Sequence, residues 1–137
     1  MLQLLTLAAV ALQATSGAAD HAAHLKKCAK VCAECQATCE SCAKHCSTLA
    51  DQGKKEHVKT AQYCADCAQC CKLCASLCSS GSPLAKHMLD CCEDCCEDCA
   101  KSCESMPDDK HMAECARTCR DCAKHCHEME EMLDKND

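Results

Sequence analysis

Between Asp20 and Ala50, the positions that would face a helix seam recur at alternating steps of four and three. This spacing is the heptad pattern of helices that pack along one stripe. The stripe is occupied by Cys28, Cys32, Cys35, Cys39, Cys42 and Cys46. Charged residues such as Lys30, Glu34 and Lys44 fall between the cysteines. The segment is therefore predicted to be a helix with a thiol-lined inner face.

Three later segments carry a similar stripe, and chain breakers separate all four. Gly53, the Gly81–Pro83 region and Pro107 divide the chain into helices predicted at about 20–50, 54–79, 83–105 and 107–133. Short connections favour antiparallel neighbours, so we expect an all-α, up-down-up-down four-helix bundle with a cysteine-lined core. The later stripes contain Cys64, Cys67, Cys70, Cys71, Cys74, Cys78, Cys91, Cys92, Cys95, Cys96, Cys99, Cys103, Cys115, Cys119, Cys122 and Cys126.

Composition explains why these cysteines must form the interior. The chain has 22 cysteines among 137 residues, with no Phe or Trp. From Asp20 onward, its larger apolar side chains are seven Leu, two Val, five Met and one Tyr. That set is too small for an ordinary aliphatic core. The interior is therefore predicted to consist of cysteine, or of something that cysteine binds.

Charge excludes one class of partner. The formal net charge is −6, and Arg117 and Arg120 are the two arginines. A protein that binds nucleic acid needs a basic surface, and single-stranded nucleic acid also needs aromatic side chains for base stacking. We therefore expect no nucleic-acid partner.

Residues 1–19 differ from the rest of the chain. They contain no charged residue, and an apolar stretch is followed by small residues up to Ala19. This pattern is typical of a signal peptide with a small-residue cleavage site, although the usual positive residues at its start are missing. We expect a mature domain of residues 20–137 without a membrane span, exported and periplasmic. If the segment is not a signal, the expected location is the cytoplasm.

The cysteine spacing indicates which metal the core would bind. Cysteines at i and i+4 on a helix lie on the same face, so two thiolates can converge on one ion. Two or three sulfur ligands suit monovalent copper, which is soft and accepts low coordination numbers. Zinc usually takes four ligands, often from turns. Without sharing, pairs of sulfurs from 22 cysteines would hold about 11 ions, so all 22 are candidate Cu(I) ligands.

On this pattern the chain resembles the bacterial copper storage proteins, with the likeness extending over about Asp20 to Leu133. The resemblance implies a four-helix bundle that stores many Cu(I) ions and is not an enzyme. It also implies a homotetramer of bundles. Exported members of the family supply copper to copper enzymes such as particulate methane monooxygenase, which would make a copper enzyme or carrier the recipient.

Histidines and methionines gather at the predicted ends of the bundle. One end would contain the candidate metal entrance, for which we favour His24, His87, Met88, His125 and Met129. Imidazole and thioether groups can pass copper to thiolates, and in the resembling family such residues ring the open mouth. The other end would collect His45, His57, Tyr63, Met106, His111 and Met112. Histidines at helix ends are also common as solvated, dipole-compatible residues.

Other readings of the cysteines remain open. A metallothionein-like store for zinc or another soft divalent metal would use the same thiols. A disulfide-stabilised structural bundle is compatible with an even number of cysteines and with export. Cysteines at i and i+4 of one helix nevertheless have poor geometry for a disulfide. A redox enzyme is disfavoured because no Cys-x-x-Cys pair stands at a helix start.

Overall fold

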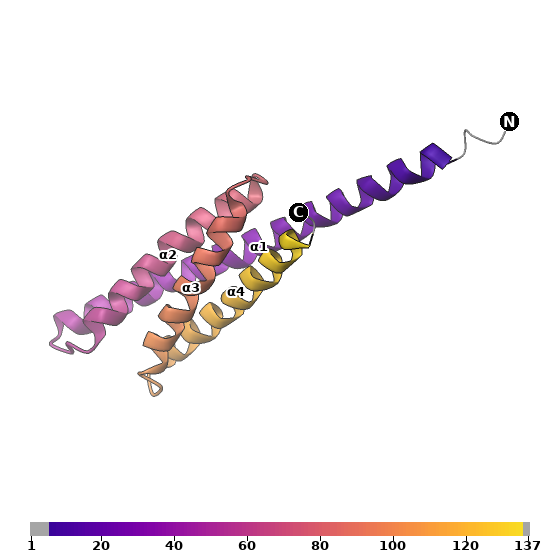
Figure 1. Cartoon of the computed structure of the whole chain (residues 1–137). Coiled ribbons are helices and arrows are strands. Elements are labelled where there is room, and N and C mark those ends of the chain that lie inside the picture. The colour runs from indigo at the N-terminus through magenta and orange to yellow at the C-terminus, as the bar shows by residue number, and fades with distance from the viewer. Residues whose placement is uncertain (1–5, 136–137) are drawn as a thin grey trace.

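The structure is a computed structural model that describes residues 6–135, with side chains described from residue 17 onward. It contains four helices: α1 (Thr6–Asp51), α2 (His57–Ser79), α3 (Ala85–Glu104) and α4 (Lys110–Asp134). The predicted all-α four-helix bundle is confirmed. Helix α1 packs against α2 and α4, and α3 packs against the same two helices. The four helices therefore enclose a single interior (Figure 1).

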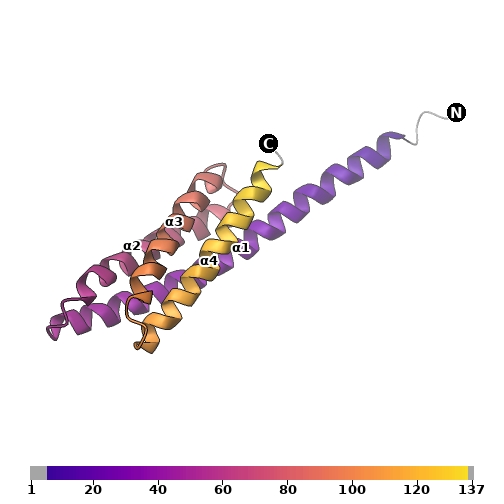
Figure 2. The same ribbon diagram turned by 60° about the horizontal axis from the view of Figure 1, so that its bottom comes forward.

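Helix α1 is longer than the sequence predicted. It begins at Thr6 rather than near Asp20, and its N-terminal part extends beyond the other three helices (Figures 1 and 2). The described part of the predicted signal segment is thus continuous with the first bundle helix, while residues 1–5 lie outside the described residues. Among residues 6–135, no helix is both long and apolar enough to cross a bilayer.

Two glycines end the first two helices. Gly53 (φ 94°) and Gly81 (φ 61°) adopt the left-handed conformation, which glycine reaches without a Cβ penalty. After α1, the Lys54 amide donates to the Leu49 carbonyl at 3.0 Å, which closes the last turn. The connection to α2 is therefore a tight reversal.

The last three helices all begin later than predicted, at His57, Ala85 and Lys110. Ser82, in the predicted break at Gly81–Pro83, lies before the helical residues of α3, and its hydroxyl accepts a hydrogen bond from the Leu84 amide at 3.2 Å. Pro107 and its neighbour form a turn, and Asp109 is the N-cap of α4. Its carboxylate accepts hydrogen bonds from two amides of the first turn, at 2.9 and 3.3 Å. Asp109 therefore precedes the helical residues of α4, because an N-cap residue has an extended backbone.

The interior has the composition that the sequence predicted. Among the described residues, the buried cluster consists of cysteines, six alanines, and three larger apolar side chains, Leu89, Met112 and Met129. His57 and Thr60 are the buried polar residues of the same part of the chain. Sulfur therefore replaces the aliphatic core of an ordinary bundle.

Candidate metal centre

Nineteen of the 22 cysteines are buried in the bundle interior, and we call them the sulfur core. The other three are Cys70 and Cys95, which are half-buried, and Cys91, which is exposed. All 22 thiols are free in the structure. Because each helix presents its stripe of cysteines to the same interior, the predicted metal-ligand residues are brought together along the length of the bundle.

Sulfur atoms of α1 and α4 form a series of contacts along the two helices, and we call such a series a ladder. Cys39 Sγ lies 3.5 Å from Cys119 Sγ, and Cys32 Sγ lies 3.8 Å from Cys126 Sγ. Further along α1, the Cys46 thiol donates to the Met112 thioether at 3.4 Å. The partner's number falls as the number in α1 rises, so the two helices pass in opposite directions. The ladder therefore joins the first helix of the chain to the last.

Helices α2 and α3 form a matching ladder on the other side of the interior. The Cys99 thiol donates to Cys64 Sγ at 3.7 Å, and the Cys67 thiol donates to Cys96 Sγ at 3.6 Å. Next along α2, Cys71 Sγ lies 3.7 Å from Cys96 Sγ. These distances are far above the length of a disulfide bond, about 2.05 Å. Neighbouring thiols at these distances are close enough to share a bound ion.

The two ladders combine into groups of four sulfurs in which all atoms lie within 4.8 Å of one another. Each of the five groups named below takes its sulfurs from at least three helices, and several cysteines belong to two of them. Such sharing allows a thiolate to bridge two ions. Five such groups are Cys32, Cys92, Cys122 and Cys126; Cys35, Cys39, Cys67 and Cys119; Cys35, Cys71, Cys96 and Cys122; Cys39, Cys99, Cys115 and Cys119; and Cys64, Cys99, Cys103 and Cys115.

The same-helix pairs predicted from sequence are present within these groups. Cys35 Sγ and Cys39 Sγ, for example, lie 3.9 Å apart on α1. What the spacing could not supply was the identity of the sulfurs that approach from other helices. Cys119, from α4, completes the group around this pair together with Cys67 from α2. The unit of the core is thus an interhelical cluster rather than an isolated pair.

Burial and mutual hydrogen bonding shift the pKa values of the core thiols in both directions. Burial raises the pKa of Cys46 to about 12, and neighbouring thiols and Asp109 add to this effect. A hydrogen bond with Cys103 lowers the pKa of Cys64 to about 5. Hydrogen bonding to Cys119 likewise lowers the pKa of Cys35. Protons in the core are therefore shared between thiols, and a metal ion that binds there must displace them.

Three of the five candidate entrance residues line one small pocket at an end of the bundle. His24 lies on α1, His125 and Met129 lie on α4, and Cys28 of the sulfur core lines the same pocket of about 50 Å³. The other two candidates, His87 and Met88, lie near the start of α3 and do not line it. His87 is exposed and Met88 is half-buried. The pocket therefore connects surface imidazoles directly to a core thiol.

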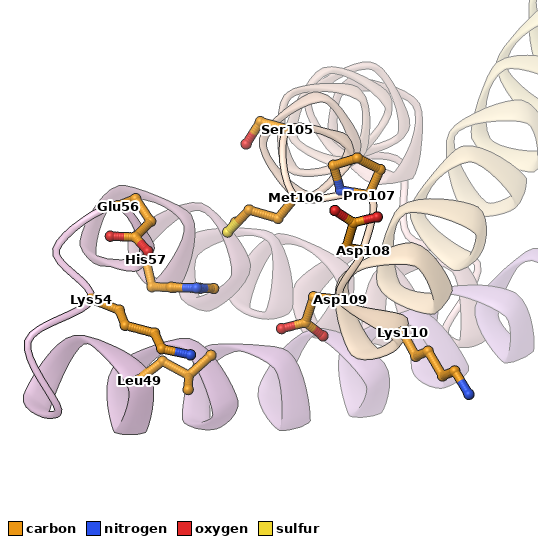
Figure 3. A pocket seen from close by; sticks show the side chains of 10 residues that line it. All are labelled: Leu49, Lys54, Glu56, His57, Ser105, Met106, Pro107, Asp108, Asp109 and Lys110. Carbon is orange, nitrogen blue, oxygen red and sulfur yellow. The ribbon is translucent and has the colours of Figure 1, made fainter.

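A wider cleft of about 640 Å³ opens at the other end, beside the connections that follow α1 and α3. Figure 3 shows the His57 ring directed into this cleft, with Met106 and Asp109 across from it. His57 is 6% exposed, and its Nδ1 atom is buried without a hydrogen-bond partner. His57 is therefore a buried imidazole at this end with one ring nitrogen unpaired among the described residues.

Two further histidines at this end have structural partners. His45 Nε2 lies 2.7 Å from an Asp109 carboxylate oxygen, and the His45 ring stacks on His111 at a centroid distance of 4.5 Å. Ser41 Oγ lies 3.1 Å from His111 Nε2. These contacts hold the end of α1 to the start of α4. The sequence placed the residues at one end, but their pairing depends on the helix register.

Residues 9–131 match the sequence model of the copper storage protein family. The chain belongs to the copper storage protein family. It is also similar to a solved structure, the Nmul_A1745 protein from Nitrosospira multiformis, with 32% sequence identity and a TM-score of 0.68. That similarity covers 79% of this chain and 95% of the other. A search of curated proteins gave no match.

Family membership and geometry agree on a metal store. The match spans all four helices, and the buried cysteines are grouped within the distance that metal binding requires. Because the groups extend along the bundle and share sulfurs, the arrangement suits many ions rather than one. The chain is thus a cysteine-based store for multiple metal ions, and a storage family suggests a non-enzymatic protein.

Proposed function

We propose that the protein stores many Cu(I) ions through its cysteine thiolates, for sequestration, detoxification or supply to copper enzymes. The observation that carries this proposal is the set of shared four-sulfur groups in the sulfur core. Cu(I) accepts two or three thiolates and tolerates bridging, so neighbouring groups can fill together. A divalent ion such as Zn²⁺ takes four ligands, so the same set of thiols would hold fewer divalent ions than Cu(I) ions.

Titration of the reduced, metal-free protein with Cu(I) tests the proposal. A Cu(I) chelator present in competition reports the tightly bound ions. We expect saturation above about ten equivalents, because 22 thiols are available and thiolates can bridge. Saturation at one or two equivalents would contradict storage. A parallel titration with Zn²⁺ tests the alternative, since a divalent store should bind several Zn²⁺ ions tightly in competition with a zinc chelator.

The state of the thiols in freshly prepared protein tests the structural alternative. All 22 thiols are free in the structure, and their nearest sulfur contacts run between helices. We expect thiol counting under anaerobic conditions to find most of them reactive after unfolding. A count near zero without reductant would favour the disulfide-stabilised bundle.

We also propose that the pocket around His24 and His125 admits copper to the sulfur core. Its support is that Met129 and Cys28 line the same pocket, which forms a path from imidazole through thioether to thiol. His24→Ala combined with His125→Ala should slow Cu(I) uptake without changing the final number of ions. An unchanged uptake rate would argue against this entrance. Exposed His87 can be replaced by alanine as a matched control.

Three further proposals concern the export of the protein, its oligomeric state and the recipient of its copper. The uncharged segment 1–19 supports export to the periplasm, and the resemblance described in the sequence analysis implies a homotetramer that passes copper to a copper enzyme or carrier. N-terminal sequencing of protein from its own cells should find a start near Asp20. Light scattering on the cleaved protein should give four times the chain mass, whereas a monomer mass would contradict the tetramer.

A further inference from the structure

Three pairs of consecutive cysteines cannot be explained by a stripe of cysteines that faces only the interior, because one member of each pair must point elsewhere. The Cys-Cys dipeptides of this chain are Cys70-Cys71 on α2, and Cys91-Cys92 and Cys95-Cys96 on α3. Consecutive helical residues point about 100° apart, so both members of a dipeptide cannot face the bundle axis. In each dipeptide the second cysteine is buried and the first is not. We call Cys70, Cys91 and Cys95 the outer triad.

The outer triad forms one group at the surface between α2 and α3. Cys70 Sγ lies 3.0 Å from Cys95 Sγ, which is shorter than the sulfur contacts of the core described above. Cys91 and Cys95 are separated by one helical turn and therefore lie on the same face of α3. Burial raises the pKa of the Cys70 thiol, and nearby Cys91 adds to this effect. Three sulfurs from two helices thus converge outside the sulfur core.

The cysteine that follows each member of the outer triad in sequence is buried in the interior. Cys71 Sγ lies 3.8 Å from Cys92 Sγ and 3.7 Å from Cys96 Sγ. Each outer thiol is therefore next in sequence to a thiol of this inner contact. Cys71 and Cys96 also belong to the four-sulfur group that includes one cysteine from every helix. The outer triad and the thiols of this central group therefore occupy adjacent positions on α2 and α3.

We propose that Cys70, Cys91 and Cys95 form a lateral copper-exchange site, through which Cu(I) passes between the sulfur core and an external thiol or chelating partner. This inference rests on the proposed Cu(I) storage. Exchange at this site is ligand substitution: an incoming thiolate forms a copper–sulfur bond, one protein thiolate leaves, and copper remains Cu(I). A leaving thiolate with a pKa above the ambient pH takes up a proton. No oxidant or reductant is needed.

The outer triad is accessible to an external partner, whereas the core cysteines are not. The 19 core cysteines are buried, so a bulky partner cannot approach their ions directly. Exposed Cys91 and half-buried Cys70 and Cys95 are accessible to such a partner. Three thiolates also match a coordination number that Cu(I) accepts. The lateral site lies beside the interior along α2 and α3, so it is distinct from the pocket around His24.

The test compares copper release from fully loaded protein to bicinchoninate, a bulky coloured Cu(I) chelator. In the variant Cys70→Ser/Cys91→Ser/Cys95→Ser, we expect the initial release rate to fall about tenfold or more, as loss of metal-site groups commonly costs. Capacity should fall only by the ions that the triad itself holds. Asp66→Ser/Asp94→Ser, which changes exposed residues of the same two helices, is the matched control and should release copper at the original rate.

The end-pocket variant His24→Ala/His125→Ala distinguishes the two routes. A release rate lowered in the triad variant, with the core still loaded, supports lateral exchange. A rate lowered only in the end-pocket variant, or in neither, overturns it while leaving storage intact. If the original protein does not bind many Cu(I) ions, the storage proposal itself fails.

A measurement on the unchanged protein avoids any folding defect of the triad variant. Brief alkylation of metal-free protein, followed by peptide mass spectrometry, should label Cys91 first because it is exposed. Full copper loading should protect Cys91, Cys70 and Cys95 together. Equal labelling of Cys91 with and without copper would overturn the proposal, because the outer triad would then hold no ion.

Discussion

Cys39 Sγ lies 3.5 Å from Cys119 Sγ, although 80 residues separate them along the chain. The contact joins α1 to α4 within a buried cluster that, in the part of the chain the structure describes, is mostly cysteine and alanine. An ion bound between such sulfurs would link helices that have little other apolar packing. Metal loading and folding stability are therefore expected to be strongly coupled.

This coupling predicts a large thermal stabilisation by copper. A ligand at a thousand times its dissociation constant stabilises a protein by about 4 kcal/mol per site. For a domain of this size, we expect the melting temperature to rise by at least about 15 °C on Cu(I) loading. Circular dichroism at the helix band, with and without copper, measures the shift. Equal melting temperatures would mean that the ions do not link the helices.

Cys119 should be more important to capacity than a cysteine in one group. It belongs to two four-sulfur groups, one with Cys35 and one with Cys99. In Cys119→Ala, we expect the number of tightly bound Cu(I) ions to fall by about two, since bridging thiolates serve more than one ion. The metal-free variant should lose only about 1 kcal/mol of stability, because the change leaves a small cavity.

Competitive Cu(I) titration measures the capacity, and urea unfolding measures the stability. Lys124→Ala, on the exposed face of the same helix, serves as the control and should keep the full capacity. If Cys119→Ala also kept it, the shared-sulfur arrangement would not describe the loaded protein.

The buried thiol of Cys46 is expected to make the stability of the metal-free bundle decrease at alkaline pH. Burial raises the pKa of this thiol from an ordinary value of 9.0 to about 12. The folded state therefore holds the proton more tightly than the unfolded state. The contribution to stability is complete below about pH 9 and is lost as the pH rises toward about 12.

Urea midpoints of Cys46→Ala and of the original protein, both reduced and metal-free, should converge over this pH range. The exposed Cys91→Ala variant is the matched control, and its difference from the original protein should not change in the same way. A constant gap for Cys46→Ala would show that its thiol is not held protonated by burial.

Asp109 is expected to matter for stability at the wide-cleft end. Burial alone would raise the pKa of its carboxyl, but hydrogen bonds with His45 and with two amides of α4 lower it overall. The carboxylate therefore contributes stability above its ordinary pKa of 3.8, and this contribution is lost as the pH falls through the lower folded value. We expect Asp109→Ala to cost about 1 kcal/mol at neutral pH through the lost cap.

Asp108→Ala provides the matched control, because Asp108 is exposed and is not the cap residue. Urea unfolding of both variants at neutral pH and near pH 3 measures the effect. The difference between them should shrink at the lower pH as the Asp109 carboxylate becomes protonated. A difference that does not depend on pH would contradict a role for the charge.

Much of the fold followed from the sequence because one residue type marks every inner face. The heptad spacing of cysteine gave four helices, and Gly53 and Gly81 marked two of the three connections. Helix starts were less accurate, because Ser82 and Pro107 precede turns before α3 and α4 rather than the first helical residues. The start of α1 at Thr6 was also missed, since the apolar segment was interpreted only as an export signal.

The sequence by itself determined that the interior is made of sulfur, because no other residue type is present in sufficient number to fill it. It could not determine which sulfurs meet. Spacing within a helix fixes pairs such as Cys35 and Cys39, but a group with Cys67 and Cys119 depends on how far neighbouring helices are displaced along the bundle. Only the tertiary structure decided that register. It also decided that Cys70 and Cys95 meet at the surface, because their contact depends on the packing of α2 against α3.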